Sequence, residues 1–243
     1  MDPVSFVRSL ELENYSGAFH GDGHIAGSPK SEGLVDAGSL VSFTSHLNTQ
    51  QKEDVLNSTM LAQLAANAKY DRFTQTEDWY KFYTEVMGKI GWVMQGFKFE
   101  NFQSNQTDFK ISQVVLQLLT ALIGSDEELM NVVKETIDGL AKSQEGVSLF
   151  SSKSASPNRG NFQILPCTVD KSNQITVCFL GCSFQASQVD SNYFFFTYAK
   201  QDITLFKAGQ VVTLNEDVYA QVREEVKKKL GTRAKDFVHN LDI

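Results

Sequence analysis

The sequence predicts an α+β fold, in which helical hairpins pack on an antiparallel β-sheet within a single domain. Two pairs of helix-like segments precede residue 143, and strand-like runs joined by short turns fill residues 146–213. The regular alternation of strand and helix that indicates a parallel sheet is missing from the sequence. A length of 243 residues, with 42% hydrophobic and 21% charged residues, suits one globular domain.

Four segments follow one another along this domain. Residues 1–47 are rich in glycine and predict a loop with one or two short strands. Residues 48–143 predict two helical hairpins with intervening strands, and residues 146–213 predict the sheet strands. Residues 214–243 predict C-terminal helices.

The first helical pair is expected between Asn48 and Ile90. Asn48 or Thr49 caps a helix that ends near Lys69. Thr74 and Glu77 have the spacing of a capping box, which opens the second helix. Residues 92–103 and 107–111 then predict a hairpin or a pair of strands.

The second pair covers Ile111–Leu140. Its first half, Ile111–Ile123, carries no charge, and this predicts a helix buried almost all round. Ser125 and Glu128 again have capping-box spacing, and the helix that follows has one apolar and one charged face.

The sheet strands are expected after this pair. Gly146–Ser151 predicts a strand and residues 152–161 a flexible polar loop. The longer strands are predicted from their β-branched and aromatic content at Phe162–Val169, Ile175–Gln185, Tyr193–Ala199 and Ile203–Thr213. The run Tyr193–Tyr198 is apolar on both faces, which indicates a central strand or an interface.

Two helices are expected at the C-terminal end. Thr213 and Glu216 give a third capping-box spacing, for a helix that ends at Leu230. A last short helix carries Phe237, Val238 and Leu241.

Charge and hydropathy exclude some classes of function. A net charge of -7 and a pI near 5.1 argue against nucleic acid as a partner, because no basic surface is available to neutralise phosphates. No run reaches the ~18 apolar residues that a membrane-spanning helix needs. The first residues lack a signal-peptide pattern, so we expect synthesis in the cytoplasm, with later release by lysis or a leaderless route left open.

Catalytic chemistry finds no support in the sequence. Cys167, Cys178 and Cys182 lie in strand-like sequence and are expected to be buried thiols without disulfides. No G-x-S-x-G elbow is present, and adjacent acidic residues lie on solvated helix faces. We therefore expect a non-enzymatic protein with no cofactor and no small-molecule substrate.

One loop carries possible metal ligands. His20, Asp22 and His24 are spaced two apart, so in an extended loop their side chains project to the same side. The intervening glycines give the loop freedom that a preorganised site would have to lose. A plain surface loop is the favoured interpretation, and no metal is expected.

Aromatic residues are concentrated in two stretches and have two interpretations. The favoured one is a phenylalanine-rich core. The other is a surface that binds lipid headgroups or a second copy of the chain, in which case the contact residues are Trp92, Phe97, Phe99, Tyr193, Phe194, Phe195, Phe196 and Tyr198. The second interpretation gives two hypotheses, a membrane-interacting protein and a homo-oligomeric assembly protein with no membrane role.

The order of elements resembles that of the Cyt-type cytolysins, which include the δ-endotoxins and similar toxin-like virulence factors. Asn48–Ile90 and Ile111–Leu140 resemble their two helical hairpins, and the three segments Ile175–Gln185, Tyr193–Ala199 and Ile203–Thr213 resemble their long strands. The resemblance implies a water-soluble toxin or virulence protein with helix layers around a sheet. It also implies direct lipid binding, with helices that lift from strands that then form a pore.

Overall fold

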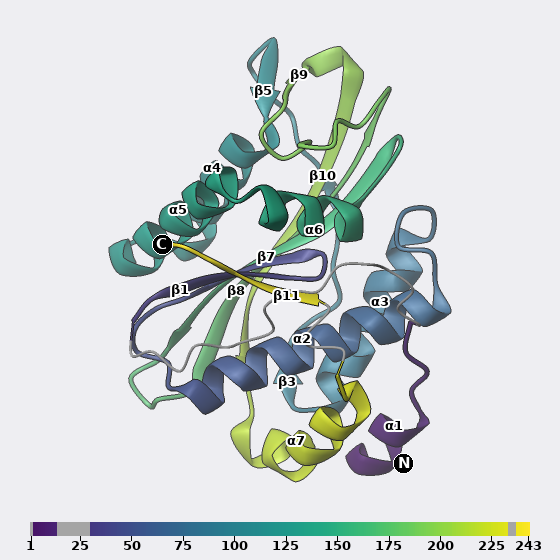
Figure 1. Cartoon of the computed structure of the whole chain (residues 1–243), viewed down its shortest axis with the longest axis vertical. Coiled ribbons are helices and arrows are strands. Elements are labelled where there is room, and N and C mark those ends of the chain that lie inside the picture. The colour runs from purple at the N-terminus through teal and green to yellow at the C-terminus, as the bar shows by residue number, and fades with distance from the viewer. Residues whose placement is uncertain (1, 14–29, 233–236) are drawn as a thin grey trace.

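The computed structural model describes residues 2–13, 30–232 and 237–243 as one compact α+β domain. A mixed but mostly antiparallel sheet runs through the molecule, and helices cover both of its faces (Figure 1). The predicted fold class is confirmed.

The main sheet joins strands from every part of the described chain. Along it the order is β11 (Val238–Leu241), β1 (Glu32–Asp36), β2 (Ser39–Phe43), β7 (Arg159–Val169), β8 (Ile175–Ala186), β10 (Ile203–Leu214) and β3 (Trp92–Val93). Two short strands extend it, because β4 (Glu100–Asn101) pairs with β10 and β6 (Ala155–Ser156) with β7. A separate two-stranded sheet joins β5 (Asp108–Lys110) and β9 (Thr197–Ala199).

One pairing corrects the expectation of a purely antiparallel sheet. β2 and β7 run parallel, with Leu40 opposite Ile164 and Phe43 opposite Cys167. The chain between them contains α2 (Thr49–Lys69), α3 (Thr76–Lys89), α4 (Ile111–Ile123), α5 (Glu127–Lys142) and α6 (Gln144–Ser154). Such a long crossover permits parallel pairing, which a short turn does not.

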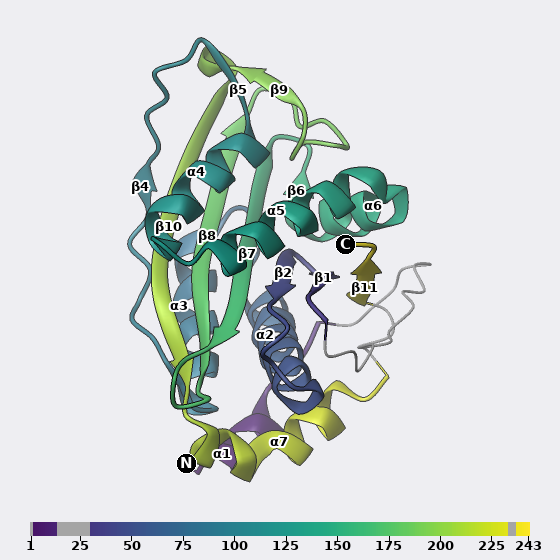
Figure 2. The same cartoon turned by 90° about the vertical axis from the view of Figure 1, so that its left-hand side faces the viewer.

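The helices form two layers. On one face, α2, α3 and α7 (Glu216–Leu230) share a core cluster with Leu165, Val177 and Phe179 of the sheet. On the other face, α4, α5 and α6 share a second cluster with Ile164, Leu180 and other sheet residues. Figure 2 shows α4 and α3 on opposite sides of β8 and β10. An additional helix, α1 (Pro3–Ser9), packs beside α7 and was not expected from the sequence.

Helix caps explain where several helices begin. Asn48 caps α2 in a capping box with Gln51, which confirms the expected start of the helix. The capping boxes predicted at Thr74, Ser125 and Thr213 do not form. The helices α3, α5 and α7 have Gln75, Asp126 and Asn215 at their N-cap positions. Asp126 accepts from Leu129 N at 2.9 Å to cap α5, and Asn215 accepts from Val218 N at 3.2 Å to cap α7.

Residues 144–156 do not form the expected strand and flexible loop. Ser143 accepts a 3.0 Å hydrogen bond from Gly146 N and caps α6, which buries Leu149 and Phe150 on one face. α6 continues into β6, which pairs with β7 at Ser156 and Arg159. The buried residues Gly146, Phe150 and Ser154 are four apart, as on one face of a helix, and this spacing together with the cap outweighs the strand propensity of the segment.

The segment Tyr193–Ala199 is not the expected central strand. Residues 191–195 form turns, in which the backbone N–H groups of Phe195 and Phe196 both donate to Asn192 O at 3.0 Å. Only residues 197–199 form a strand, β9, which pairs with β5. Both faces of the run are apolar because the rings fill the core irregularly, a pattern that sequence periodicity cannot separate from a buried strand.

The C-terminal end and α4 also differ from expectation. Val238 and Leu241, which were expected in a last short helix, lie in β11, and β11 pairs antiparallel with β1. α4 has the predicted bounds, but it is not buried all round. Gln113, Gln117 and Thr120 are exposed, and Leu118 is only partly buried.

Candidate functional site

The apolar centre of the sheet, between the two helix layers, is the candidate functional site. β7, β8 and β10 are 11 or 12 residues long, and each sends apolar side chains to both faces. In β8, for example, Val177 and Phe179 face α2 and α3, whereas Leu180 and Cys182 belong to the α4–α5 side. We call α2 with α3 the polar cover and α4 with α5 the apolar cover, for the contacts described next.

The polar cover meets the sheet through a chain of buried hydrogen bonds. Gln63 accepts from Gly38 N and donates to Asp36 O, both at 3.1 Å, and so holds the turn between β1 and β2. On α3, Tyr80 lies 2.9 Å from Asn161 Oδ1, and Gln163 Nε2 donates to the Tyr80 hydroxyl at 3.0 Å. These bonds fix the helix pair in register on the sheet because each buried polar group would lose its partner if the pair moved.

Charged groups are also buried at the polar cover. The Asp36 side chain lies 2.7 Å from Thr59 Oγ1, and its burial raises the pKa of this carboxyl to about 7. The Arg72 guanidinium stacks on Trp79 at 4.8 Å and donates to Lys153 O at 2.7 Å, and burial lowers the pKa of Arg72.

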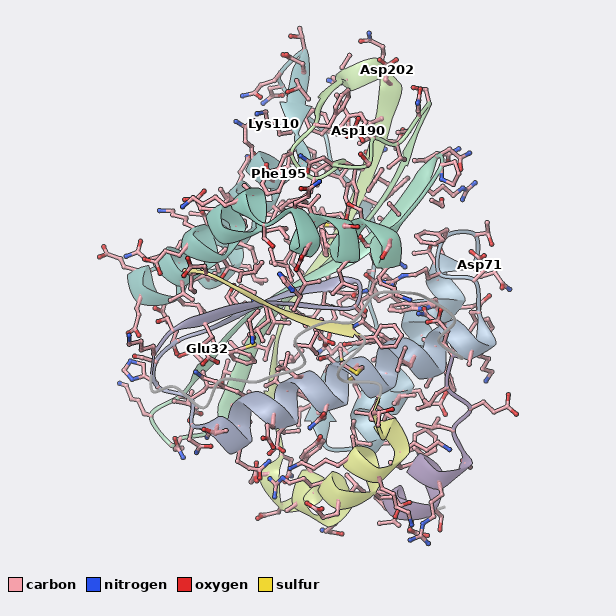
Figure 3. All side chains as sticks on the ribbon, in the orientation of Figure 1. Glu32, Asp71, Lys110, Asp190, Phe195 and Asp202 are labelled. Carbon is pink, nitrogen blue, oxygen red and sulfur yellow. The ribbon has the colours of Figure 1, made fainter. Side chains whose placement is uncertain are left out.

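Lys52 forms a further buried charge at the start of α2. Its Nζ donates to Lys30 O at 2.9 Å and lies 3.2 Å from Glu32 Oε2. In Figure 3 Glu32 lies at the left side of the molecule, below its middle, whereas Asp202 lies near the top. The sequence did not indicate any of these buried charges, because a single Lys, Arg or Asp in a polar stretch looks like a surface residue.

The apolar cover makes a different kind of contact. Its centre packs by aliphatic side chains, including Val115, Leu119, Val133 and Ile137, against the sheet. In the described part of the chain, its side-chain hydrogen bonds to strands or their loops lie at the ends of the cover. Glu128 meets His46 at 3.0 Å, and Ser143 meets His239 at 3.1 Å. Loss of the central contacts would therefore leave few buried polar groups without partners.

The residues predicted for a membrane or subunit surface lie mostly in the core. Trp92, Tyr193, Phe194 and Tyr198 are buried, and this favours the core interpretation for these four. Phe97 and Phe99 are partly buried and pack on Tyr80 with ring centroids 5.0 and 4.8 Å apart.

Two aromatic side chains of the same set remain accessible. Phe195 is partly buried, and Phe196 is 46% exposed. Phe195 lies at the β5–β9 end of the molecule, near Lys110 and Asp190 (Figure 3).

Two more large apolar side chains are exposed where the apolar cover ends. Val93 is 62% exposed and Val211 is 53% exposed. Val93 pairs with Thr213, two residues from Val211, so both valines project to the same face of the sheet. That face also holds Gly209, which lies against Leu122 of the apolar cover.

The three cysteines are free and buried, as predicted. Burial raises the pKa of Cys178 to about 11 and raises those of Cys167 and Cys182 well above the ordinary thiol value. Thiols in this environment are poor nucleophiles at neutral pH.

His20, Asp22 and His24 lie outside the described residues, so the structure does not test the metal prediction. Within residues 2–13, 30–232 and 237–243, no three His, Cys, Asp or Glu side chains are grouped as metal ligands. In the same ranges, every helix is too short or too polar to cross a bilayer.

Solved structures that are similar to this chain include a toxin and a virulence factor. No protein-family model matches the chain, and no curated protein sequence matches it. A solved structure described as a delta-endotoxin is similar with a TM-score of 0.44 and 14% identity, covering 84% of this chain and 90% of that one. The structure of the Evf virulence factor is similar with a TM-score of 0.37 and 13% identity, covering 96% of this chain and 88% of that one.

Proposed function

We propose that this protein is a non-enzymatic, membrane-interacting toxin or virulence protein whose apolar cover, α4 with α5, lifts from the sheet at a lipid surface. The observation that carries the proposal is the unequal attachment of the two covers. α4 and α5 hold the centre of the sheet by aliphatic contacts, with their polar contacts at the ends.

Lipid can replace the contacts of the apolar cover. Acyl chains are as apolar as the side chains that α4 and α5 bury, so the freed face of β7, β8 and β10 stays out of water when it meets lipid. The same exchange at the polar cover would leave Asp36, Tyr80 and Gln163 without their partners. The polar cover is therefore expected to stay on the sheet.

First contact with lipid is assigned to side chains that are already exposed. Val93 and Val211 project from the same face of the sheet that the apolar cover packs on. The cover reaches as far as Gly209, which lies against Leu122, and leaves the two valines exposed. Their exposure places apolar surface beside the cover before it moves, which is the position from which lipid could enter beneath it.

A disulfide across the cover tests the proposal. A Cβ built on Gly33 of β1 would lie 3.1 Å from Cβ of Thr136 on α5. This separation is slightly below the usual range of about 3.5–4.5 Å for Cβ atoms of a disulfide. The closer atoms that Gly33 faces, Thr136 Oγ1 and Cγ2, are removed by the same pair of substitutions, G33C/T136C. The native thiols are buried and do not compete.

The measurement is flotation and dye release with two kinds of vesicle. One is phosphatidylcholine alone, and the other contains about one phosphatidylglycerol in five lipids, which adds negative surface charge. We expect wild type and the reduced double variant to bind and release dye, and the oxidised variant to lose at least about tenfold in release. Oxidised and reduced forms of one chain are the matched control, and T136C alone controls for the loss of the Thr136 methyl. Equal release by the oxidised form would disprove lifting of α4–α5, and failure of wild type to bind either vesicle would disprove the membrane role.

Homo-oligomerisation without a membrane role is the competing hypothesis. It was based on Tyr193–Tyr198 as an exposed aromatic strand, and the burial of Tyr193, Phe194 and Tyr198 removes that motivation. Light scattering over a concentration series without lipid tests it directly. A defined oligomer in water that does not float with vesicles would favour the assembly role.

A further inference from the structure

An uncharged groove lies near the β5–β9 end of the molecule, between the loop that precedes β5 and the outer face of α4. Its volume is about 490 Å³. Five side-chain amides line it, together with Ser104 and the apolar side chains of Phe102, Phe109 and Val114; the amides are Gln103, Asn105, Gln106, Gln113 and Gln117. None of the lining residues carries a charge, although the chain has a net charge of -7.

A smaller hollow lies beside β10 and shares part of the same wall. This hollow has a volume of about 160 Å³ and shares Phe102, Gln103, Ser104 and Phe109 with the groove. It adds the polar residues Asn101 and Thr204 and one charged residue, Lys200, whose ammonium donates to Ser104 O.

The loop that forms one wall is held in place by hydrogen bonds. Lys200 Nζ donates to Ser104 O at 2.6 Å, and Lys200 N donates to Thr107 O at 2.9 Å. The Ser104 hydroxyl accepts from Gln106 N at 3.0 Å, and Phe102 N donates to Leu205 O at 2.7 Å. The backbone of the wall is thus fixed before a ligand arrives, which lowers the entropy cost of binding.

The opposite wall is a helix face of unusual composition for solvent exposure. Gln113 and Gln117 are exposed and lie one turn apart on α4, so their amides point to the same side. The exposed face of α5 carries Glu127, Lys134, Glu135 and Asp138, which is the ordinary composition of a solvated helix face. α4 contains no charged residue, so Gln113, Gln117 and Thr120 supply the polar groups of its exposed face.

The chemistry of the groove selects among ligand classes. An amide side chain both donates and accepts hydrogen bonds, and so do the hydroxyl groups of a sugar. The half-buried ring of Phe102, which packs edge-on against Phe109 at 6.1 Å, offers an apolar face to the C–H groups of a sugar ring. The lining of the groove itself has no charge to offset the desolvation of phosphate, sulfate, sialic acid or a charged peptide, and the ammonium of Lys200 in the adjoining hollow is already bonded to Ser104 O.

We propose that this groove binds a neutral oligosaccharide. The groove is built from the outer face of α4 and the loop before β5, whereas β10, one of the lipid-facing strands of the proposed function, lines only the adjoining hollow. A glycan bound there would tether the protein to a glycosylated surface through a helix of the apolar cover.

A glycan array tests this site without any lipid. Fluorescently labelled full-length protein is applied to immobilised neutral, sialylated and sulfated oligosaccharides and to glutamine-rich peptides, where dense display strengthens weak binding. We expect binding to one or more neutral glycans, competed by the same glycan in solution. Q113A/Q117A is expected to reduce the signal at least tenfold.

The control variant is N131A, which removes an exposed amide from the face of α5 outside the groove. It is expected to bind like wild type, and equal thermal unfolding midpoints would show that all three proteins are folded. No binding to any neutral glycan, equal binding by Q113A/Q117A, or binding only to acidic glycans or peptides would overturn the proposal. The membrane proposal stands or falls separately, because the array contains no bilayer.

Discussion

The carboxyl of Asp36 on β1 lies 2.7 Å from Thr59 Oγ1 on α2, in a position closed to solvent. Asp36 Oδ1 has no hydrogen-bond partner among the residues that the structure describes. The contact joins the sheet to the polar cover through one hydrogen bond. Desolvation raises the pKa of the Asp36 carboxyl by more than this hydrogen bond lowers it. The pKa of Asp36 is consequently raised to about 7.

The first prediction is a fall in stability as pH rises from about 4 to 7. The unfolded chain releases the Asp36 proton near its ordinary pKa of 3.8, whereas the folded chain holds the proton until about pH 7. The folded state therefore binds more protons across this range, and its stabilisation by the neutral acid is complete below pH 3.8 and lost by pH 7. The loss attributable to Asp36 is at most about 4 kcal/mol.

Urea unfolding of wild type and D36N at pH 5 and pH 8 measures this effect. The amide of D36N stays neutral, so the loss of stability between the two pH values should be smaller in D36N than in wild type. The difference between the two proteins removes the contribution of other titrating groups. Identical pH dependence in both would show that Asp36 titrates normally in the folded protein.

The second prediction concerns the ion pair between α2 and α7. Arg223 donates to both carboxylate oxygens of Asp54, with Nε–Oδ1 2.9 Å and Nη2–Oδ2 2.7 Å, and also contacts Glu216. The Asp54 side chain is only 1% exposed. R223M leaves this carboxylate buried without its cation and should cost about 3 kcal/mol of unfolding free energy.

The double variant D54N/R223M separates loss of the pair from an unpaired charge. It should be more stable than R223M, because it has no buried charge left to solvate. R8A is the control, since Arg8 pairs with Glu225 at the surface and its loss should leave the urea midpoint unchanged. A double variant no more stable than R223M would contradict this account.

Local sequence signals located the long elements well. Asn48 marks the cap of α2, and Gly231 with φ 59° follows α7 as a helix-ending glycine should. β8 and β10 agree with Ile175–Gln185 and Ile203–Thr213 to within a residue. Here a cap or a turn of a few residues contains the information that fixes the boundary.

Sequence signals failed where the partner lies far along the chain. Val238–Leu241 forms a strand because β1, some two hundred residues earlier, offers a free edge. Tyr193 leaves strand geometry because its ring fits among Phe150, Phe162 and Phe184. The sequence did not predict the uncharged groove for the same reason, since only the fold brings Gln113 and Gln117 close to residues 102–106.

The third prediction tests which side of α4 faces the core. Leu119 is fully buried and Leu118 is only partly so, although the two are adjacent in an uncharged helix. L119A should cost about 3 kcal/mol by leaving a cavity, and L118A about 1 kcal/mol. Both changes favour helix formation equally, so each is the control for the other in chemical denaturation. Equal losses would mean that α4 is buried all round, as its sequence alone suggested.

The fourth prediction concerns close packing between Gly160 of β7 and Phe184 of β8. These residues are paired across the two strands, and a Cβ added at Gly160 would lie 2.0 Å from Phe184 Cε1. The Phe184 ring cannot easily move aside because it packs on Tyr193 with ring centroids 5.1 Å apart. G160A should therefore destabilise the protein by about 1–3 kcal/mol through overpacking.

G88A is the matched control, because a Cβ at Gly88 meets nothing within 4 Å and Gly88 lies in α3. It should stabilise the helix by about 0.5–1 kcal/mol. If the clash with Phe184 is the cause, F184L should cost less in the G160A background than in wild type, since the smaller side chain relieves the contact. Additive effects of G160A and F184L in urea unfolding would instead assign the cost of G160A to the backbone.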